Sequence, residues 1–146
     1  MRTIAQVDRR PTDVVVTSWS ISSNALGQFN GWWVVLPADA SDEVIGTAVL
    51  DAWRVSAERA GFAAAPLSRE APDLLAPVYA AVSASSARAY TRGASAVALE
   101  RSNDVVVVQP LRARAGGFTA YEPEAECAAD LTAGALGALC RAALGG

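Results

Sequence analysis

The sequence predicts an α+β fold in which helices pack on a mostly antiparallel or mixed sheet. Apolar residues make up 52% of the 146 positions, enough for a sizeable core in one domain. Helical and extended patterns interleave along the chain, and one pair of extended segments has the pattern of a β-hairpin. A strand–loop–helix unit also occurs twice, at residues 31–53 and 117–140. We therefore expect a single domain over residues 1–146.

The first part of the chain predicts two strands. Residues 1–10 are polar, and we expect them to be frayed, loosely attached or disordered. Residues 13–17 are rich in β-branched side chains, which favour a short strand. Small polar residues and a glycine at 18–30 predict a loop. The aromatic and aliphatic segment 32–36 predicts the next strand, which Pro37 ends. Its two adjacent tryptophans point to opposite faces.

The best-supported helix begins near Ser41. Its hydroxyl can accept a hydrogen bond from the first turn, and the two acidic residues that follow suit the positive end of the helix dipole. Apolar residues recur at helical spacing from 45 to 55, and Gly61 suits the end of the helix. Gly46 recurs as Gly137 in the second unit, five residues after the hydroxyl in both copies. This recurrence predicts that each helix backbone lies close against a strand.

The elements beyond residue 66 are shorter. After a connector at 66–72, the pattern predicts two weak helices, a hairpin that ends at Pro110, a polar loop, one more strand and a terminal helix. Their expected ranges are 73–81 and 86–91 for the helices, 94–100 and 104–109 for the hairpin, 112–117 for the loop, 118–121 for the strand and 132–144 for the terminal helix.

The residue types argue against catalysis. The chain contains no histidine, which removes the usual general base and the commonest metal ligand. Cys127 and Cys140 alone make a zinc site implausible, and no glycine-rich phosphate-binding loop occurs. We therefore expect no enzyme and no cofactor. A carboxylate pair could still hydrolyse glycosides, with Glu122, Glu124 and Glu126 as candidates, but alternating glutamates in a loop more often form a solvated face.

The net charge predicts the kind of partner, and the hydropathy predicts whether the chain spans a membrane. The formal net charge is −3, which disfavours nucleic acid or an anionic membrane and favours a basic partner. Carboxylates gather at 39–43, 51–58 and 122–130. No apolar run reaches the roughly 18 residues of a membrane-spanning helix. Residues 1–10 lack the apolar core of a signal peptide, so we expect a cytoplasmic protein.

Three segments in this order resemble the immunity-protein family of bacterial contact-dependent growth inhibition systems. They are Leu36–Pro37 followed by Ser-Asp-Glu-Val-Ile-Gly at 41–46, Tyr-Thr-Arg-Gly-Ala at 90–94 leading into the hairpin at 97–110, and the closing segment 137–144. The resemblance implies a cytoplasmic protein without catalytic activity. It would bind the C-terminal toxin domain of a cognate delivered effector, and related systems often carry ribonuclease toxins.

The residues agree with that role on independent grounds. A nuclease site is electropositive because it holds phosphates, so an acidic surface would be steered to it and could occlude it. Interface hot spots also favour aromatic anchors. The expected toxin-binding residues are Asp39, Asp42, Glu43, Trp53, Tyr121, Glu122, Glu124 and Glu126. We expect a monomer or weak homodimer. The alternatives are a chaperone or adaptor that holds an effector, a small carboxylate enzyme, and a homo-oligomer built on exposed aromatics.

Overall fold

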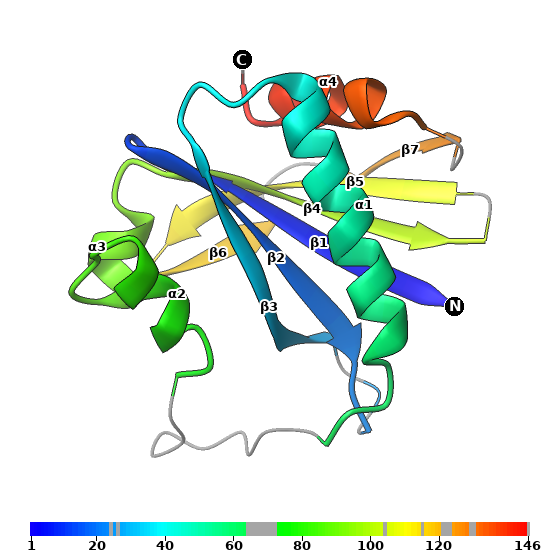
Figure 1. Cartoon of the computed structure of the whole chain (residues 1–146), viewed down its shortest axis with the longest axis horizontal. Coiled ribbons are helices and arrows are strands. Elements are labelled where there is room, and N and C mark those ends of the chain that lie inside the picture. The colour runs from blue at the N-terminus through cyan, green and yellow to red at the C-terminus, as the bar shows by residue number, and fades with distance from the viewer. Residues whose placement is uncertain are drawn as a thin grey trace.

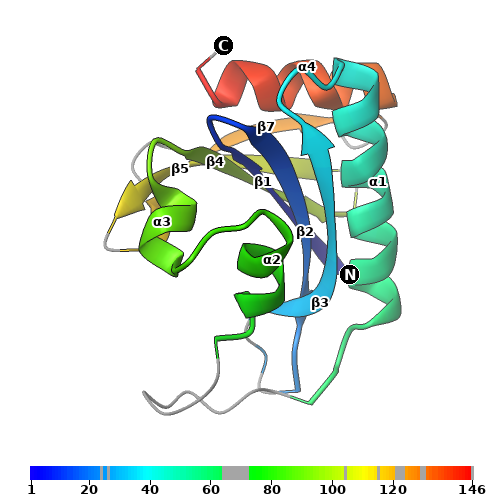
Figure 2. The same ribbon diagram turned by 60° about the vertical axis from the view of Figure 1, so that its left-hand side comes forward.

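The computed structural model describes residues 1–23, 25, 27–63, 73–103, 105–114, 116–120, 124–128 and 131–145. Within them, a seven-stranded antiparallel sheet has the order β3-β2-β1-β4-β5-β6, and β7 pairs with β5 beside β6. Helices α1 and α4 cover one face, and α2 and α3 lie on the other (Figures 1 and 2). The predicted α+β class is confirmed. The strands are β1 (Arg2–Arg9), β2 (Asp13–Ile21), β3 (Gly27–Pro37), β4 (Ser95–Ser102), β5 (Val105–Arg114), β6 (Gly117–Ala120) and β7 (Ala125–Ala128), and the helices are α1 (Asp42–Glu58), α2 (Ala76–Ala81), α3 (Ala87–Thr91) and α4 (Ala133–Ala143).

The expected frayed N-terminus is wrong, because β1 is a central strand. It pairs along its length with β2 on one side and with β4 on the other. Ala5 and Val7 are fully buried against α1 and α4, while Gln6 and Asp8 alternate with them toward the opposite face. The polar half of this alternation gave the segment its surface-like composition.

The loop expected at 18–30 is also wrong, because β2 continues to Ile21 and β3 begins at Gly27. The small polar residues of β2 lie under α1. The Ser18 hydroxyl donates to the carbonyl of Ala52 at 2.6 Å, and the Ser20 hydroxyl donates to the carbonyl of Ser56 at 2.8 Å. Buried hydroxyls remain stable when they find such partners. Here they bind the helix backbone to the strand.

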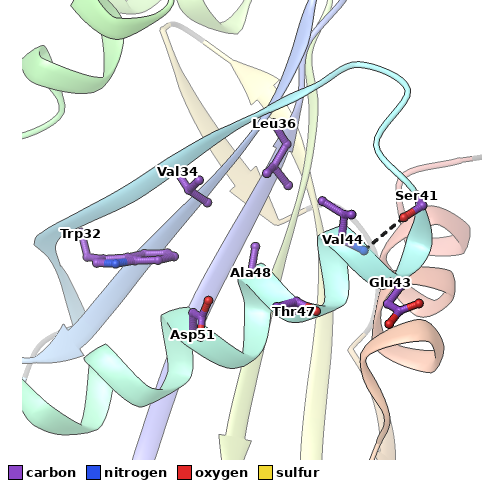
Figure 3. Close-up of a pocket in the computed structure, with 9 residues that line it drawn as sticks. All are labelled: Trp32, Val34, Leu36, Ser41, Glu43, Val44, Thr47, Ala48 and Asp51. Carbon is purple, nitrogen blue, oxygen red and sulfur yellow. Dashed lines mark hydrogen bonds between the residues drawn. The ribbon is translucent and has the colours of Figure 1, made fainter.

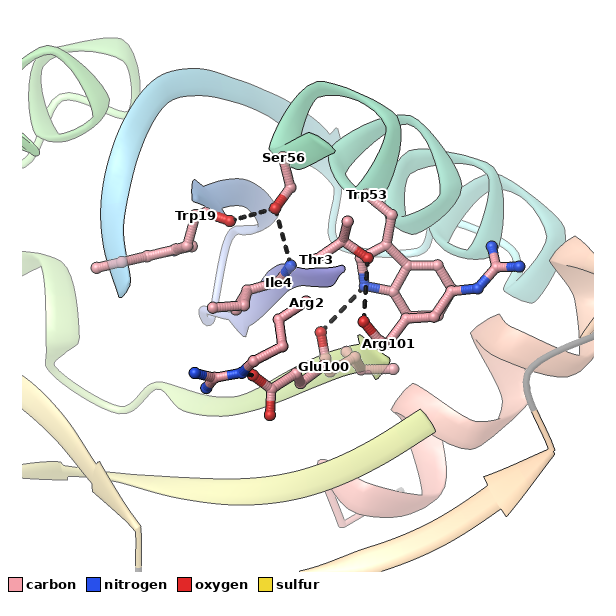
Figure 4. Close-up of polar contacts among 9 residues, drawn as sticks. Arg2, Thr3, Ile4, Trp19, Trp53, Ser56, Glu100 and Arg101 are labelled. Atoms are coloured by element: carbon pink, nitrogen blue, oxygen red, sulfur yellow. Dashed lines mark hydrogen bonds and ion pairs between the residues drawn. The ribbon is translucent and has the colours of Figure 1, made fainter. Parts of the chain in front are cut away.

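Ser56 extends this polar seam to the two strands beneath α1. Its hydroxyl donates to the carbonyl of Trp19 at 2.5 Å and accepts the backbone N–H of Ile4 at 3.0 Å (Figure 4). One helix residue therefore holds β1 and β2 at their shared end. The seam fixes the position of α1 across the sheet.

The predicted start of α1 is confirmed. The Ser41 hydroxyl accepts the N–H of Val44 at 3.2 Å, and the apolar stripe of the helix faces the sheet. This stripe, α4 and the covered strands form the larger core. Its buried members are Ala5, Val7, Val14, Val16, Ala40, Ile45, Ala48, Val49, Ala52, Trp53, Val97, Leu99, Val106, Val108, Leu136, Cys140 and Leu144.

The repeated glycine marks a contact between helices, so the predicted approach of each helix to a strand is wrong. A Cβ at Gly46 would lie 1.6 Å from the carbonyl oxygen of Ala133 on α4. A Cβ at Gly137 would lie 1.7 Å from the carbonyl oxygen of Asp42 on α1. The two helices therefore cross backbone against backbone at reciprocal glycines, where α4 passes the start of α1 (Figure 1).

The predicted hairpin is confirmed as β4 and β5, but Pro110 does not end it. β5 continues to Arg114, pairing with β7 through 105–108 and with β6 through 111–114. Pro110 falls between these two stretches, where its missing N–H costs no ladder bond on that side. The second strand–loop–helix unit therefore contains an extra strand, β7, which the first unit lacks.

A smaller cluster occupies the other face. Val15, Phe29, Val78 and Tyr90 are buried there under α2 and α3. Both helices were predicted, and the Ser86 hydroxyl caps α3 by accepting the N–H of Ala89 at 3.0 Å. Over the described residues, no helix is both long and apolar enough to span a membrane.

Candidate binding groove

A groove of about 390 Å³ runs between the edge strand β3 and helix α1. Alternate side chains of β3 project toward the helix, and α1 supplies the opposite wall (Figure 3). The lining residues are Trp32, Val34, Leu36, Ser41, Glu43, Val44, Thr47, Ala48 and Asp51. The groove has an apolar floor and polar residues along the helix side.

The periodicities of a strand and of a helix explain which side chains line the groove. Trp32, Val34 and Leu36 share one face of β3 because side chains alternate along a strand. Glu43, Thr47 and Asp51 are four residues apart and share one face of α1. Asp51 lies beside Trp32, and Glu43 lies toward the α4 end (Figure 3).

The charge of the groove is acidic. Among the described residues that line it, none is basic. Asp51 lies 3.9 Å from the Arg54 guanidinium, which contacts Glu58 more closely, at 3.0 Å. Val44 is 44% exposed, so apolar surface also reaches solvent here. An apolar floor with acidic ends suits a basic partner that also presents apolar side chains.

The acidic residues predicted at the first strand–helix junction have different surroundings. Asp39 is exposed in the turn before α1, and Glu43 is exposed at the groove. Asp42 instead pairs with Arg141 of α4, with 2.7 Å between Oδ1 and Nε. The same guanidinium donates from Nη2 to the carbonyl of Ala40 at 3.2 Å. Asp42 therefore links the two helices, which leaves less of its charge available to a partner.

The acidic residues of the second junction lie elsewhere. Glu124 and Glu126 are exposed in or beside β7, at the opposite edge of the sheet from β3. Five strand spacings separate these edges, which is about 24 Å across the sheet. The structure thus does not join the two acidic groups into one patch. Tyr121 and Glu122 lie outside the described residues.

Trp53, which was expected among the toxin-binding residues as an aromatic anchor, is buried. It is 3% exposed, and its indole N–H donates to the carbonyl of Leu99 at 3.0 Å (Figure 4). The Arg101 guanidinium lies 5.8 Å from the ring centre. Leu99 and Arg101 belong to β4, and Thr3 of β1, the segment expected to be frayed, lines the same pocket as Trp53. Trp53 therefore stabilises the core and offers little area to a partner.

Sequence reasoning missed most of the groove. Trp32 and Leu36 form part of its floor, and Asp51 forms one acidic end. None of these three was among the expected binding residues. The spacing of Glu43, Thr47 and Asp51 already indicated a shared helix face. The decisive information was the strand order, because only an edge strand leaves this side of the helix open.

The opposite face holds a second cavity of about 190 Å³. It lies between the sheet and helices α2 and α3, and Asp8 is the carboxylate among its lining residues. Burial raises the pKa of Asp8 to about 6, although hydrogen bonds from Tyr90 and Gln6 and the charge of Arg10 oppose the shift. Glycoside hydrolysis requires two carboxyl groups on opposite sides of a bond. The lining of this cavity provides one.

The buried thiol also has a defined environment. Burial raises the pKa of Cys140 to about 12, so the thiol is protonated at neutral pH and packs as an apolar group. Within the described part of the chain, no group of three or more potential ligands from His, Cys, Asp and Glu could hold a metal ion.

Comparison with known proteins identifies the fold. No protein-family model and no curated protein sequence matches this chain. A solved structure of a protein of unknown function from Neisseria meningitidis is similar, with a TM-score of 0.76 and 17% identity over 99% of this chain and 94% of that chain. A chain of the CdiA-CT/CdiI toxin and immunity complex from Yersinia pseudotuberculosis is similar, with a TM-score of 0.74 and 17% identity over 99% of this chain and 96% of that chain.

Proposed function

We propose that this protein is an immunity protein that binds and neutralises the toxin domain of a contact-dependent growth inhibition effector. The observation that carries the proposal is the similarity to a chain of the CdiA-CT/CdiI complex, which extends over nearly the full length of both chains. The similarity is one of fold, and the sequence resemblance at residues 36–46, 90–110 and 137–144 points independently to the same class of protein.

The groove between β3 and α1 supports a binding role. Its apolar floor includes the half-buried Trp32, and its acidic ends are Glu43 and Asp51. Aromatic side chains in such places commonly anchor protein interfaces, and complementary charge speeds association. The groove therefore supplies affinity through its floor and orientation through its ends. Asp39 extends the acidic surface at the turn before α1.

The partner in this proposal is a basic, nucleic-acid-cleaving toxin, for which a ribonuclease is the leading candidate. Such an enzyme must present positive charge where the substrate phosphates bind. An acidic chain with a net charge of −3 can occupy that surface without any chemical step. The inhibition is then stoichiometric, takes place in the cytoplasm, and requires neither a cofactor nor catalysis by this chain.

Co-expression tests the proposal. The toxin to be tested is the C-terminal domain of any large exported protein that is found to be encoded directly upstream of this chain, and it is produced from an inducible promoter in a host that lacks this protein. We expect growth arrest with the toxin alone and full growth when this chain is co-expressed at equal or higher level. Continued arrest despite a stable complex would contradict neutralisation and identify an effector-binding chaperone or adaptor instead.

A further inference from the structure

The cavity beneath α2 and α3 has an unusual combination of walls. Trp19 from β2, Tyr79 from α2, Tyr90 from α3 and Phe118 from β6 surround it, and the buried carboxylate of Asp8 reaches it from β1. Trp19, Tyr79 and Phe118 are only half-buried, so the cavity is accessible from solvent on the aromatic side. Gly116 and Gly117 at the start of β6 add no side chains to its rim.

Asp8 has neutral partners. Its Oδ2 atom accepts the Tyr90 hydroxyl at 2.5 Å, and its Oδ1 atom accepts the Gln6 amide at 2.8 Å. A carboxylate offers about four acceptor positions, so about two remain after these bonds. Asp8 is 3% exposed, and none of the ion pairs formed between described residues includes it.

The nearest cation already has a partner. Arg10 donates from Nη1 to both carboxylate oxygens of Asp13, each at 2.7 Å. Its guanidinium carbon also lies 4.8 Å from the centre of the Tyr90 ring. This pair is itself largely buried, so Arg10 cannot turn to Asp8 without leaving Asp13 unpaired.

We propose that this cavity binds one guanidinium group, which pairs with the Asp8 carboxylate and stacks against the aromatic walls. A guanidinium is planar, donates in a fork that matches a carboxylate, and is attracted to the faces of Trp and Tyr rings. The Trp19 indole and the Tyr79 ring line the same cavity as the carboxylate. Asp8 is already buried, and the hydrogen bonds from Tyr90 and Gln6 hold its carboxylate in place, so an opposite charge with good geometry can offset part of the cost of its burial. The proposal does not depend on the proposed immunity function.

The affinity of this site should depend on pH. The groups that surround Asp8 are Arg10 just after β1, Asp13 on β2, Asp73 before α2, Tyr79 on α2 and Tyr90 on α3. Burial raises the pKa of both tyrosines above its ordinary value, so neither carries charge below pH 8. With a pKa of about 6, Asp8 is about one-tenth ionised at pH 5 and almost fully ionised at pH 7.5. Guanidinium binding should weaken about tenfold between these two values.

A titration with methylguanidinium chloride tests the site. The Trp19 indole N–H, which donates to the Thr17 hydroxyl at 2.8 Å, gives an NMR signal at the cavity wall. We expect this signal to shift saturably at pH 7.5, with about tenfold weaker binding at pH 5. Methylurea, a neutral molecule of the same shape, should produce no saturable shift. Absence of saturation with methylguanidinium, or equal binding of methylurea, would overturn the proposal.

Two variants separate charge from packing. Asp8→Asn should lower the affinity at least tenfold and abolish the pH dependence, whereas Glu58→Gln removes the same charge from the far surface and should leave both unchanged. Tyr79→Leu keeps every charge and should weaken binding severalfold through the lost ring face, which provides a test if Asp8→Asn fails to fold. Unchanged binding in Tyr79→Leu together with a flat pH profile in the unmodified protein would contradict the assignment.

The source of the guanidinium is distinguished by two further probes. N-acetylarginine amide represents an arginine side chain in a protein, and free arginine represents a small molecule. Equal or tighter binding of the blocked form indicates a partner's side chain. Tighter binding of the free amino acid indicates a soluble ligand. Either result requires that the group binds, and failure of both probes would count against the site.

Discussion

The two faces of the sheet differ in how tightly their helices pack. The face under α1 and α4 carries the larger apolar cluster, and its helices meet backbone to backbone at Gly46 and Gly137. The face under α2 and α3 has a smaller cluster and a cavity with the buried Asp8 at its wall. The helix contact on the first face leaves no space for an added side chain, and the groove of that face lies only at its β3 edge. The second face contains a cavity and a buried carboxylate that has hydrogen-bond partners but forms no ion pair among the described residues. Stability therefore depends mainly on the packing of the first face.

The largest effect should come from filling the helix contact. In Gly137→Ala the new Cβ meets backbone atoms of Asp42 that cannot move aside as a flexible side chain would. We expect a loss of about 3 kcal/mol or more in the free energy of unfolding, measured by urea denaturation. Gly134→Ala on the same helix has nothing within 4 Å and should be neutral or stabilising. Equal effects in both variants would show that the helices do not cross at this glycine.

The second face should respond to pH. The pKa of Asp8 in the folded protein, about 6, is above its ordinary value of 3.8, so folding favours the protonated carboxyl. The contribution of the protonated Asp8 carboxyl to the free energy of unfolding is fully present below pH 4, and it is lost as the pH rises through about 6. The shift corresponds to about 2 to 3 kcal/mol. Unfolding of the unmodified protein and of Asp8→Asn, compared from pH 4 to 8, should reveal this slope only in the former. Parallel curves would contradict the burial of an ionisable group at this position.

A smaller effect is expected where α1 begins, between the first face and the groove. Ser41→Ala removes the hydroxyl that accepts the Val44 N–H. The loss should be about 1 kcal/mol in the free energy of unfolding. Ser85→Ala is a control at an exposed residue just before the α3 cap and should change stability by less than about 0.5 kcal/mol. Thermal denaturation of both variants measures the difference. Wild-type stability in Ser41→Ala would show that the Ser41 hydroxyl does not stabilise the start of α1.

Local signals in the sequence predicted the start of α1, the alternation of the strand at 32–36 and the hairpin of β4 and β5. Ser41 begins a helix because its hydroxyl satisfies an N–H of the first turn, and this depends on nearby residues alone. The adjacent Trp32 and Trp33 lie on opposite faces because strand side chains alternate. The hairpin of β4 and β5 follows from two apolar runs around a polar turn.

Features set by distant partners could not be predicted. Ser18 and Ser20 are residue types typical of loops, and they are stable in a buried strand because carbonyl groups of α1 accept their hydrogen bonds. The repeated glycines indicated that each helix backbone lies close to another element, but they did not indicate that this element is the other helix. Trp53 is buried in the core, where it contacts β4, a strand that is distant in the sequence. The groove and the cavity depend on strand order, and no local pattern in the sequence encodes that order.

The most direct test of the account is the affinity of this protein for the proposed partner, the toxin domain identified by co-expression, measured by calorimetric titration. Glu43→Arg with Asp51→Arg reverses both acidic ends of the groove, and Glu58→Arg with Glu100→Arg makes the same change of charge outside it. Glu124→Arg with Glu126→Arg determines whether the opposite edge also contributes. We predict at least tenfold weaker binding for the groove variant, about 1.4 kcal/mol, and little change for the Glu58 and Glu100 variant. Wild-type affinity in the groove variant would contradict binding at this surface.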